Sequence, residues 1–110
     1  MRVNEIKTKI KNAEPFLKDK FRVKKIGIFG SYSRGEQRKS SDIDILVDYY
    51  EDPSLFEFFD LEYYLEDILE NKVDLVMENS LKPYIGEHIL NEVIYIWKKR
   101  LQTEIIKIIY

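Results

Sequence analysis

The chain has 110 residues, of which 45% are hydrophobic and 35% charged, and its 20 acidic and 18 basic side chains leave a net charge of −2. This length fits a single domain, and the balance of charge argues against a protein whose main task is to coat nucleic acid, since such proteins carry a basic excess. With no cysteine and a lone histidine, disulfides and zinc sites rich in Cys or His are excluded. A bound metal must be held by carboxylates, which favours Mg²⁺, Mn²⁺ or Ca²⁺.

The first part of the chain predicts a helical segment, a strand and a tight turn. Apolar residues recur every three or four positions over residues 3–17, as on one face of a helix, and Pro15 predicts that this helix kinks or restarts. Residues 23–29 are rich in β-branched and apolar types and end at Gly30, which predicts a strand that runs into a turn. The polar residues 31–41 predict a short helical turn followed by a loop.

Two strands and two helices are expected next. Residues 42–47 begin with strict alternation of polar and apolar side chains, as in a strand, and residues 73–76 predict a third, shorter strand. Between them, Asp52-Pro53 predicts a helix start with Asp52 as the cap and Pro53 in the first turn. Ser80 is expected to cap the helix that follows the third strand.

A last short strand over residues 93–97 completes the predicted domain, residues 1–97. The order of elements predicts an α/β (α+β) fold in which helices cover a small mixed sheet. Residues 98–110 are basic first and rich in isoleucine last. They are expected to form a helical tail that either packs back on the domain or contacts a partner protein or a second copy, in a homo-oligomer.

No segment of the sequence indicates a membrane or export function. Charges interrupt the first twelve residues every two or three positions, unlike a signal peptide. No apolar run approaches the roughly 20 residues that a membrane-spanning helix needs. A cytoplasmic location without membrane contact is therefore expected.

The predicted strands carry three acidic residues with the spacing of a metal site. Asp42 and Asp44 stand at positions i and i+2 of one strand, so their side chains share a face, and such a pair can hold one divalent ion or bridge two. Asp74 lies between apolar residues of a later strand and joins them if the two strands pair. Each acid taken alone is more often an ordinary surface residue.

A candidate phosphate-binding turn precedes the first two acids. Gly30 at the end of a strand lets the backbone approach a ligand closely, and a helix that begins at Ser31 directs free N–H groups toward the turn. Ser31 adds a hydroxyl and Arg34 a guanidinium fork that matches phosphate oxygens. Taken alone, Gly30-Ser31 is most often an ordinary strand-to-helix turn.

Taken together, these motifs resemble those of a known family. The run Gly30-Ser31-Tyr32-Ser33-Arg34-Gly35, followed by Ser41-Asp42-Ile43-Asp44-Ile45-Leu46-Val47, resembles the signature of the polymerase-β-like nucleotidyltransferase superfamily, and in particular of its minimal nucleotidyltransferase (MNT) group. Residues 73–76 stand where that group has its third acid, and residues 81–95 resemble its closing helix and strand. The resemblance covers roughly residues 20–96. Ser33 stands where many members have alanine, and the tail extends beyond the core of the group.

The resemblance implies a polymerase-β-like nucleotidyltransferase fold and an enzyme that uses ATP with Mg²⁺, two ions in all. It assigns the triphosphate to Gly30 and Ser31, with Arg34 as a further phosphate ligand. It assigns the metals to Asp42, Asp44 and Asp74, which are also the catalytic residues. Asp74 faces the attacking hydroxyl group and is a candidate to accept its proton.

The resemblance also implies a partner, because MNT proteins are commonly paired with a small helical HEPN protein as the antitoxin of a toxin–antitoxin system. Members of the group can transfer AMP from ATP to a tyrosine of that toxin, and this is the leading hypothesis. A non-catalytic antitoxin module that binds the toxin without transfer is one alternative. A nucleotidyltransferase that acts on RNA or on a small molecule is the other, although strong nucleic-acid binding is not expected from the charge balance.

Overall fold

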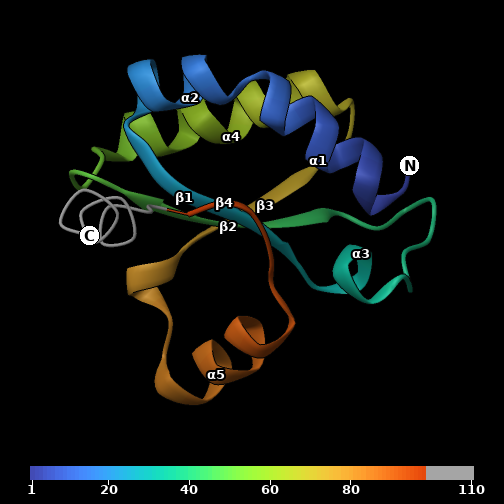
Figure 1. Ribbon diagram of the computed structural model, residues 1–110. Coiled ribbons are helices and arrows are strands. Elements are labelled where there is room, and N and C mark those ends of the chain that lie inside the picture. Colours follow the sequence, from blue (N-terminus) through green and yellow to red (C-terminus); the bar gives the residue numbers. More distant parts are fainter. Residues whose placement is uncertain (99–110) are drawn as a thin grey trace, which may run out of the picture.

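A four-stranded mixed sheet in the order β3-β2-β1-β4 lies at the centre of the computed structural model, which describes residues 1–98 (Figure 1). The strands are β1 (Val23–Phe29), β2 (Ile43–Tyr49), β3 (Val73–Met77) and β4 (Ile94–Trp97). β1 pairs antiparallel with both β2 and β4, whereas β2 and β3 run parallel. The predicted α/β fold with a small mixed sheet is confirmed.

Helices cover the two faces of the sheet unequally. On one face lie α1 (Val3–Asn12), α2 (Glu14–Phe21) and α4 (Leu55–Leu69), whereas α5 (Pro83–Glu92) covers the other face and the single-turn α3 (Ser31–Arg34) lies at one end (Figure 1). The main core lies under the three-helix layer and includes Ile6, Ile45 and Leu65, none of them exposed to solvent. A smaller core lies under α5 and contains Phe29, Leu46 and Ile89.

Most predicted elements are present with small shifts in their ends. The helical pattern over residues 3–17 is divided, because α1 ends at Asn12 and α2 restarts at Glu14 with Pro15 in its first turn. Proline lacks an N–H and is tolerated there, since first-turn N–H groups have no partner within the helix. The predicted restart is therefore confirmed. β2 begins at Ile43, one residue later than expected, so Asp42 lies just before the strand.

Two predicted helix caps were wrong. The cap of α4 is Ser54 and not Asp52: the Ser54 Oγ accepts a hydrogen bond from the Glu57 N–H at 3.2 Å, and the Ser54 N–H donates to Glu57 Oε1 at 3.1 Å. This reciprocal pair satisfies two N–H groups at once, which a cap at Asp52 would not do. Ser80 lies in a 3₁₀ turn, Glu78–Ser80, and α5 begins after Lys82, with Pro83 in its first turn.

Glutamates from α4 cover the free edge of β3. The Val73 N–H donates to Glu66 Oε2 at 3.1 Å, and the Leu75 N–H donates to Glu62 Oε2 at 3.3 Å. Alternate residues of a strand and residues four apart on a helix both repeat at roughly 6–7 Å, so the two series match. The edge N–H groups are thereby withheld from pairing with another chain.

The tail predicted over residues 98–110 lies, from residue 99 onward, outside the described residues. None of the helices within residues 1–98 combines the length and the apolar character that spanning a bilayer requires.

Candidate active site

Asp44 and Asp74 lie side by side at one end of the sheet. Each is the second residue of its strand, and the parallel register of β2 and β3 pairs them directly. The two strand neighbours of Asp44, Ile43 and Ile45, point into the main core, so alternation directs Asp44 to the opposite face. Neighbouring strands lie roughly 4.8 Å apart, which brings the two carboxyl groups within reach of a common ligand.

The carboxyl group of Asp44 lacks a compensating positive charge. Burial, followed by the charges of Asp74 and Asp42 and a hydrogen bond to Asp74, raises the pKa of Asp44 from 3.8 to about 6, and Arg34 opposes this only in part. Two like charges that share a site raise one pKa in this way. A divalent cation would offset these negative charges, and carboxylates are the ligands that Mg²⁺ prefers.

Asp42, the third acid of the predicted metal site, lies outside the strand that carries Asp44. It is exposed, it lies just before β2, and its charge still reaches Asp44. Within residues 1–98 no three His, Asp or Glu side chains are close enough together to form a metal cluster. The structure thus brings Asp44 and Asp74 together and leaves Asp42 nearby, outside a closed cluster. These donors fit a hard cation in their chemistry.

Gly30 allows the backbone to pass directly against Asp44. The last residue of β1, Phe29, pairs with Asp44, so Gly30 follows at the position beside that carboxyl group. Its φ of 73° and ψ of −150° belong to a region that only glycine adopts readily. A Cβ at this position would collide with Oδ2 of Asp44. The glycine therefore creates a cradle between the turn and the acid pair.

The single turn of α3 is fixed by bonds to the Gly30 carbonyl group. This oxygen accepts from the Ser33 N–H at 3.1 Å, the Arg34 N–H at 3.2 Å and the Ser33 hydroxyl at 2.8 Å. Gly35, with a φ of 70°, ends the turn. Among the described residues no side chain or backbone group binds the hydroxyl of Ser31. The hydroxyl group of Ser31 is thus free of partners within the described part of the chain, and its contact with phosphate stays a prediction.

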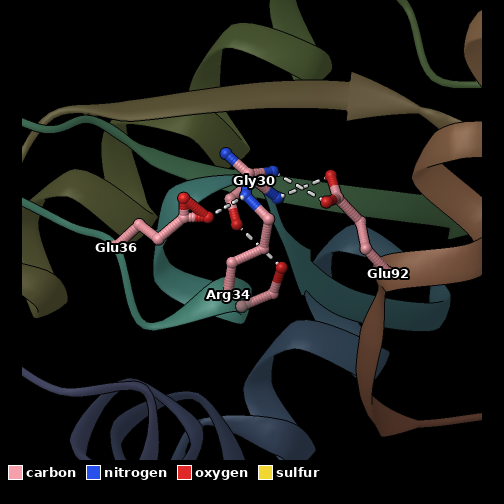
Figure 2. Close-up of polar contacts among 5 residues, drawn as sticks. Gly30, Arg34, Glu36 and Glu92 are labelled. Atoms are coloured by element: carbon pink, nitrogen blue, oxygen red, sulfur yellow. Dashed lines mark hydrogen bonds and ion pairs between the residues drawn. The ribbon is translucent and has the colours of Figure 1, made fainter.

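Arg34 is held by two carboxylates (Figure 2). Its Nε donates to Glu36 Oε1 at 2.9 Å and its Nη1 to Glu92 Oε2 at 2.7 Å. The bonds to Glu92 and then Glu36 raise the pKa of Arg34 above its ordinary value. The other oxygen of Glu92 accepts from the Gly30 N–H at 3.1 Å. Two of the groups predicted to bind phosphate, the Gly30 N–H and the Arg34 guanidinium group, are therefore already engaged by acids of the protein itself.

Sequence reasoning missed Glu92. It is 62 residues from Gly30, and an acid at the end of a helix carries no signal that it will reach a distant turn. Its position depends on how α5 packs across the sheet, which only the folded structure reveals.

Comparisons with known proteins identify the family of the chain. A family model described as the nucleotidyltransferase domain matches residues 10–96, and the chain therefore belongs to the nucleotidyltransferase domain family. Within that family its relatives are named protein adenylyltransferases. One from Methanocaldococcus jannaschii is 50% identical over 95 residues, which cover 86% of this chain and 97% of that protein. MntA of Thermococcus cleftensis is 54% identical over 80 residues, which cover 73% of this chain and 81% of that protein.

Solved structures give the same fold. A minimal nucleotidyltransferase superposes with a TM-score of 0.72 at 33% identity, over 86% of this chain and 95% of that chain. A chain from a toxin–antitoxin complex crystallised with AMP-PNP also gives a TM-score of 0.72, at 28% identity, over 90% of this chain and 78% of that chain. The predicted membership of the minimal nucleotidyltransferase group is confirmed, and the protein is a nucleotidyltransferase.

Proposed function

We propose that this protein is a Mg²⁺-dependent protein adenylyltransferase and antitoxin, which transfers AMP from ATP to a tyrosine hydroxyl group of a partner HEPN toxin. The observation that carries the proposal is the in-register pair of Asp44 and Asp74 beside the Gly30 turn. The names of the relatives, protein adenylyltransferases, support the reaction. The similarity to a toxin–antitoxin complex with AMP-PNP supports both the nucleotide and the kind of partner.

In this proposal each predicted site residue has a role in the transfer. Gly30, Ser31 and Arg34 bind the triphosphate, with the free hydroxyl of Ser31 and the backbone of the turn as donors. Asp42, Asp44 and Asp74 would hold Mg²⁺, and the ion would supply positive charge to the phosphate oxygens. Asp74 stands on the edge strand of the sheet and is itself exposed. It therefore faces the incoming acceptor and takes its proton.

The transfer is a displacement at the α-phosphorus. The tyrosine oxygen forms a bond to that phosphorus, the bond to the β-phosphate oxygen breaks, and pyrophosphate leaves. Such a reaction needs positioning and charge neutralisation more than covalent chemistry by the protein. A histidine base is not required, and His88, the lone histidine, is exposed on α5.

A protein acceptor fits the described part of the chain. Residues 1–98 form one domain around one sheet, and none of them forms a second unit that would hold an acceptor. An acceptor that brings its own folded surface meets this condition. The net charge of −2 gives no general attraction to RNA.

Labelled ATP tests the proposal. We would incubate the protein with a HEPN toxin from its native host, Mg²⁺ and ATP labelled at the α-phosphate, and identify the labelled residue by mass spectrometry. Label on a toxin tyrosine is expected, with at least a hundredfold loss in Asp44→Asn. Asp48→Asn is the matched control, because Asp48 lies on the same strand and is paired with Lys24, at 3.7 Å.

The same assay separates the alternatives. Toxin that is neutralised without label, equally by the wild type and Asp44→Asn, would establish a binding module in place of the enzyme. Label that appears on added RNA or on a small molecule, and not on the toxin, would replace the acceptor and leave the chemistry in place.

A further inference from the structure

The carboxylate of Glu92 lies across two groups that bind phosphate in the proposed function, the Gly30 N–H and the Arg34 guanidinium group (Figure 2). We propose that Glu92 is an internal competitor for the phosphates of the nucleotide, and that it sets how tightly the triphosphate binds. The proposal rests on the proposed function, because it concerns the nucleotide site of that enzyme.

Glu92 reproduces the contacts of a phosphate group. One of its oxygens accepts from the Gly30 N–H at 3.1 Å and the other from Arg34 Nη1 at 2.7 Å. A backbone N–H at a glycine turn together with a guanidinium fork is the combination of donors that proteins use for phosphate oxygens. The carboxylate thus occupies two donors that a triphosphate requires.

Glu36 offers an internal comparison. It also accepts from Arg34, at Nε and 2.9 Å, but it makes no bond to Gly30. Its side chain is 61% exposed, whereas that of Glu92 is 26% exposed and reaches the turn from the end of α5. Both acids offset the charge of Arg34, and Glu92 alone of the two also occupies the backbone donor.

Nucleotide and Glu92 exclude each other at these donors. A triphosphate and a carboxylate on the same two groups would place like charges in contact at a half-buried site, which is unfavourable. The Glu92 side chain can leave without unfolding α5, because the end of the helix is held separately. The Val93 N–H bonds to the Ile89 carbonyl oxygen at 2.9 Å, and Val93 packs against the core under α5. Binding therefore costs the two hydrogen bonds of Glu92 and no larger rearrangement.

Removal of the negative charge should tighten binding. Glu92→Gln keeps the size of the side chain and loses the charge that strengthens both bonds. Isothermal titration with Mg²⁺ and a non-hydrolysable ATP analogue is expected to give a Kd about tenfold lower for this variant than for the wild type. Inorganic tripolyphosphate should show the same change, because the competition concerns phosphate and not the base.

Glu36→Gln is the matched control. It removes the same charge from the same guanidinium group without touching Gly30, and its Kd is expected to stay within about threefold of the wild-type value. Thermal unfolding of each protein shows that it is folded. If Glu92→Gln is not folded, Glu92→Asp replaces it. The shorter side chain of aspartate cannot span both donors, so this variant should also bind the nucleotide more tightly than the wild type.

Two results would overturn the inference. In the first, a folded Glu92 variant binds both anions with the wild-type Kd or more weakly, which would make Glu92 a support of the turn and not a competitor. In the second, Glu36→Gln tightens binding as much as Glu92→Gln does, which would leave only a general charge effect. Failure of the proposed function is recognised separately, since the wild type and Asp44→Asn would then bind Mg²⁺ and the ATP analogue equally.

Discussion

The carboxyl group of Asp44 opposes folding at neutral pH. Its pKa of about 6 in the folded protein exceeds the ordinary value of 3.8, chiefly because of burial and then of the charges of Asp74 and Asp42. The folded state therefore binds this proton more tightly than the unfolded chain does. The free energy of unfolding falls as the pH rises from 3.8 to about 6, and it stays low above that range.

Asp44→Asn should accordingly stabilise the metal-free protein above pH 7. We expect a gain of about 1 kcal/mol at pH 7.5, a value reduced for solvent screening because the group is only partly buried. At pH 4 the gain should vanish, since Asp44 is then protonated in the folded protein. Urea unfolding in the presence of EDTA measures both values. An equal effect at the two pH values would show that the acid pair is not strained.

Gly30 is predicted to tolerate no substitution, whereas Gly35 is predicted to tolerate alanine at a modest cost in stability. Both have positive φ, 73° and 70°, but an added Cβ meets the Asp44 carboxyl group at Gly30 and nothing within 4 Å at Gly35. Gly35→Ala should cost about 1 kcal/mol of stability through backbone strain and should spare nucleotide binding. Gly30→Ala should cost about 3 kcal/mol and abolish binding, since the backbone region is closed to alanine and Asp44 must move. Equal losses in urea unfolding and calorimetric titration would contradict the cradle.

The sequence predicted the individual site residues and not their contacts. The strand pattern predicted that Asp74 would join Asp44 if their two strands paired, because alternation fixes the face of each side chain. The parallel pairing that places them side by side is known only from the structure. That Arg34 lies between Glu36 and Glu92 could not be foreseen. The contact with Glu92 depends on how α5 packs over the sheet, and no local sequence pattern predicts that packing.

Among the described elements, α4 covers the free edge of β3 with two glutamates. Glu62 and Glu66 accept hydrogen bonds from alternate N–H groups of β3 at 3.3 and 3.1 Å. Their helix has no basic residue that would pair with them instead. A sheet edge that loses such protection can pair with another chain.

Replacement of Glu62 and Glu66 together by alanine should therefore promote self-association. We expect a loss of about 2 kcal/mol of stability, because two N–H groups lose charged acceptors, and a concentration-dependent rise in light scattering. Asp67→Ala is the control, since Asp67 is exposed on the same helix and caps no strand group. Scattering that rises equally in both proteins would argue against edge protection.

The sequence predicted the start or end of an element correctly where a local rule decides the structure. Pro15 ends a helical repeat because its ring excludes a continuing helix, so the restart could be foreseen. The cap of α4 could not be chosen locally: Asp52 and Ser54 are both good cap residues, and the decision came from Glu57, which bonds back to Ser54. Asp52 instead accepts from the Asn79 side chain at 3.3 Å.

In the whole molecule, the two faces of the sheet have separate tasks. The face under α1, α2 and α4 holds the main core and supplies most of the apolar burial. The opposite face is covered by α5 over only part of its length (Figure 1). The acid pair lies where β2 and β3 begin, beside the Gly30 turn that leads into α3. The protein can therefore hold two like charges close together on one face of the sheet, because most of the apolar burial that stabilises the fold lies on the other face.

Mg²⁺ should consequently stabilise the folded protein. A cation that binds only the folded state adds about 1.4 kcal/mol at ten times its Kd, or roughly 6 °C in Tm for a domain of this size. Asp44→Asn and Asp74→Asn should lose this shift, and Asp48→Asn should keep it, because Asp48 is paired with Lys24 at the far end of β2. Differential scanning fluorimetry with Mg²⁺ measures the shift. A shift that persists in Asp44→Asn would place the ion elsewhere.

A crystal structure with a non-hydrolysable ATP analogue and Mn²⁺ tests most directly whether the acids and the Gly30 turn form one site. The anomalous signal of Mn²⁺ is expected between the carboxyl groups of residues 44 and 74, with the phosphates against Gly30 and Arg34 and the Glu92 side chain turned away. Mn²⁺ bound away from this acid pair, or a triphosphate that does not touch the turn, would contradict the account.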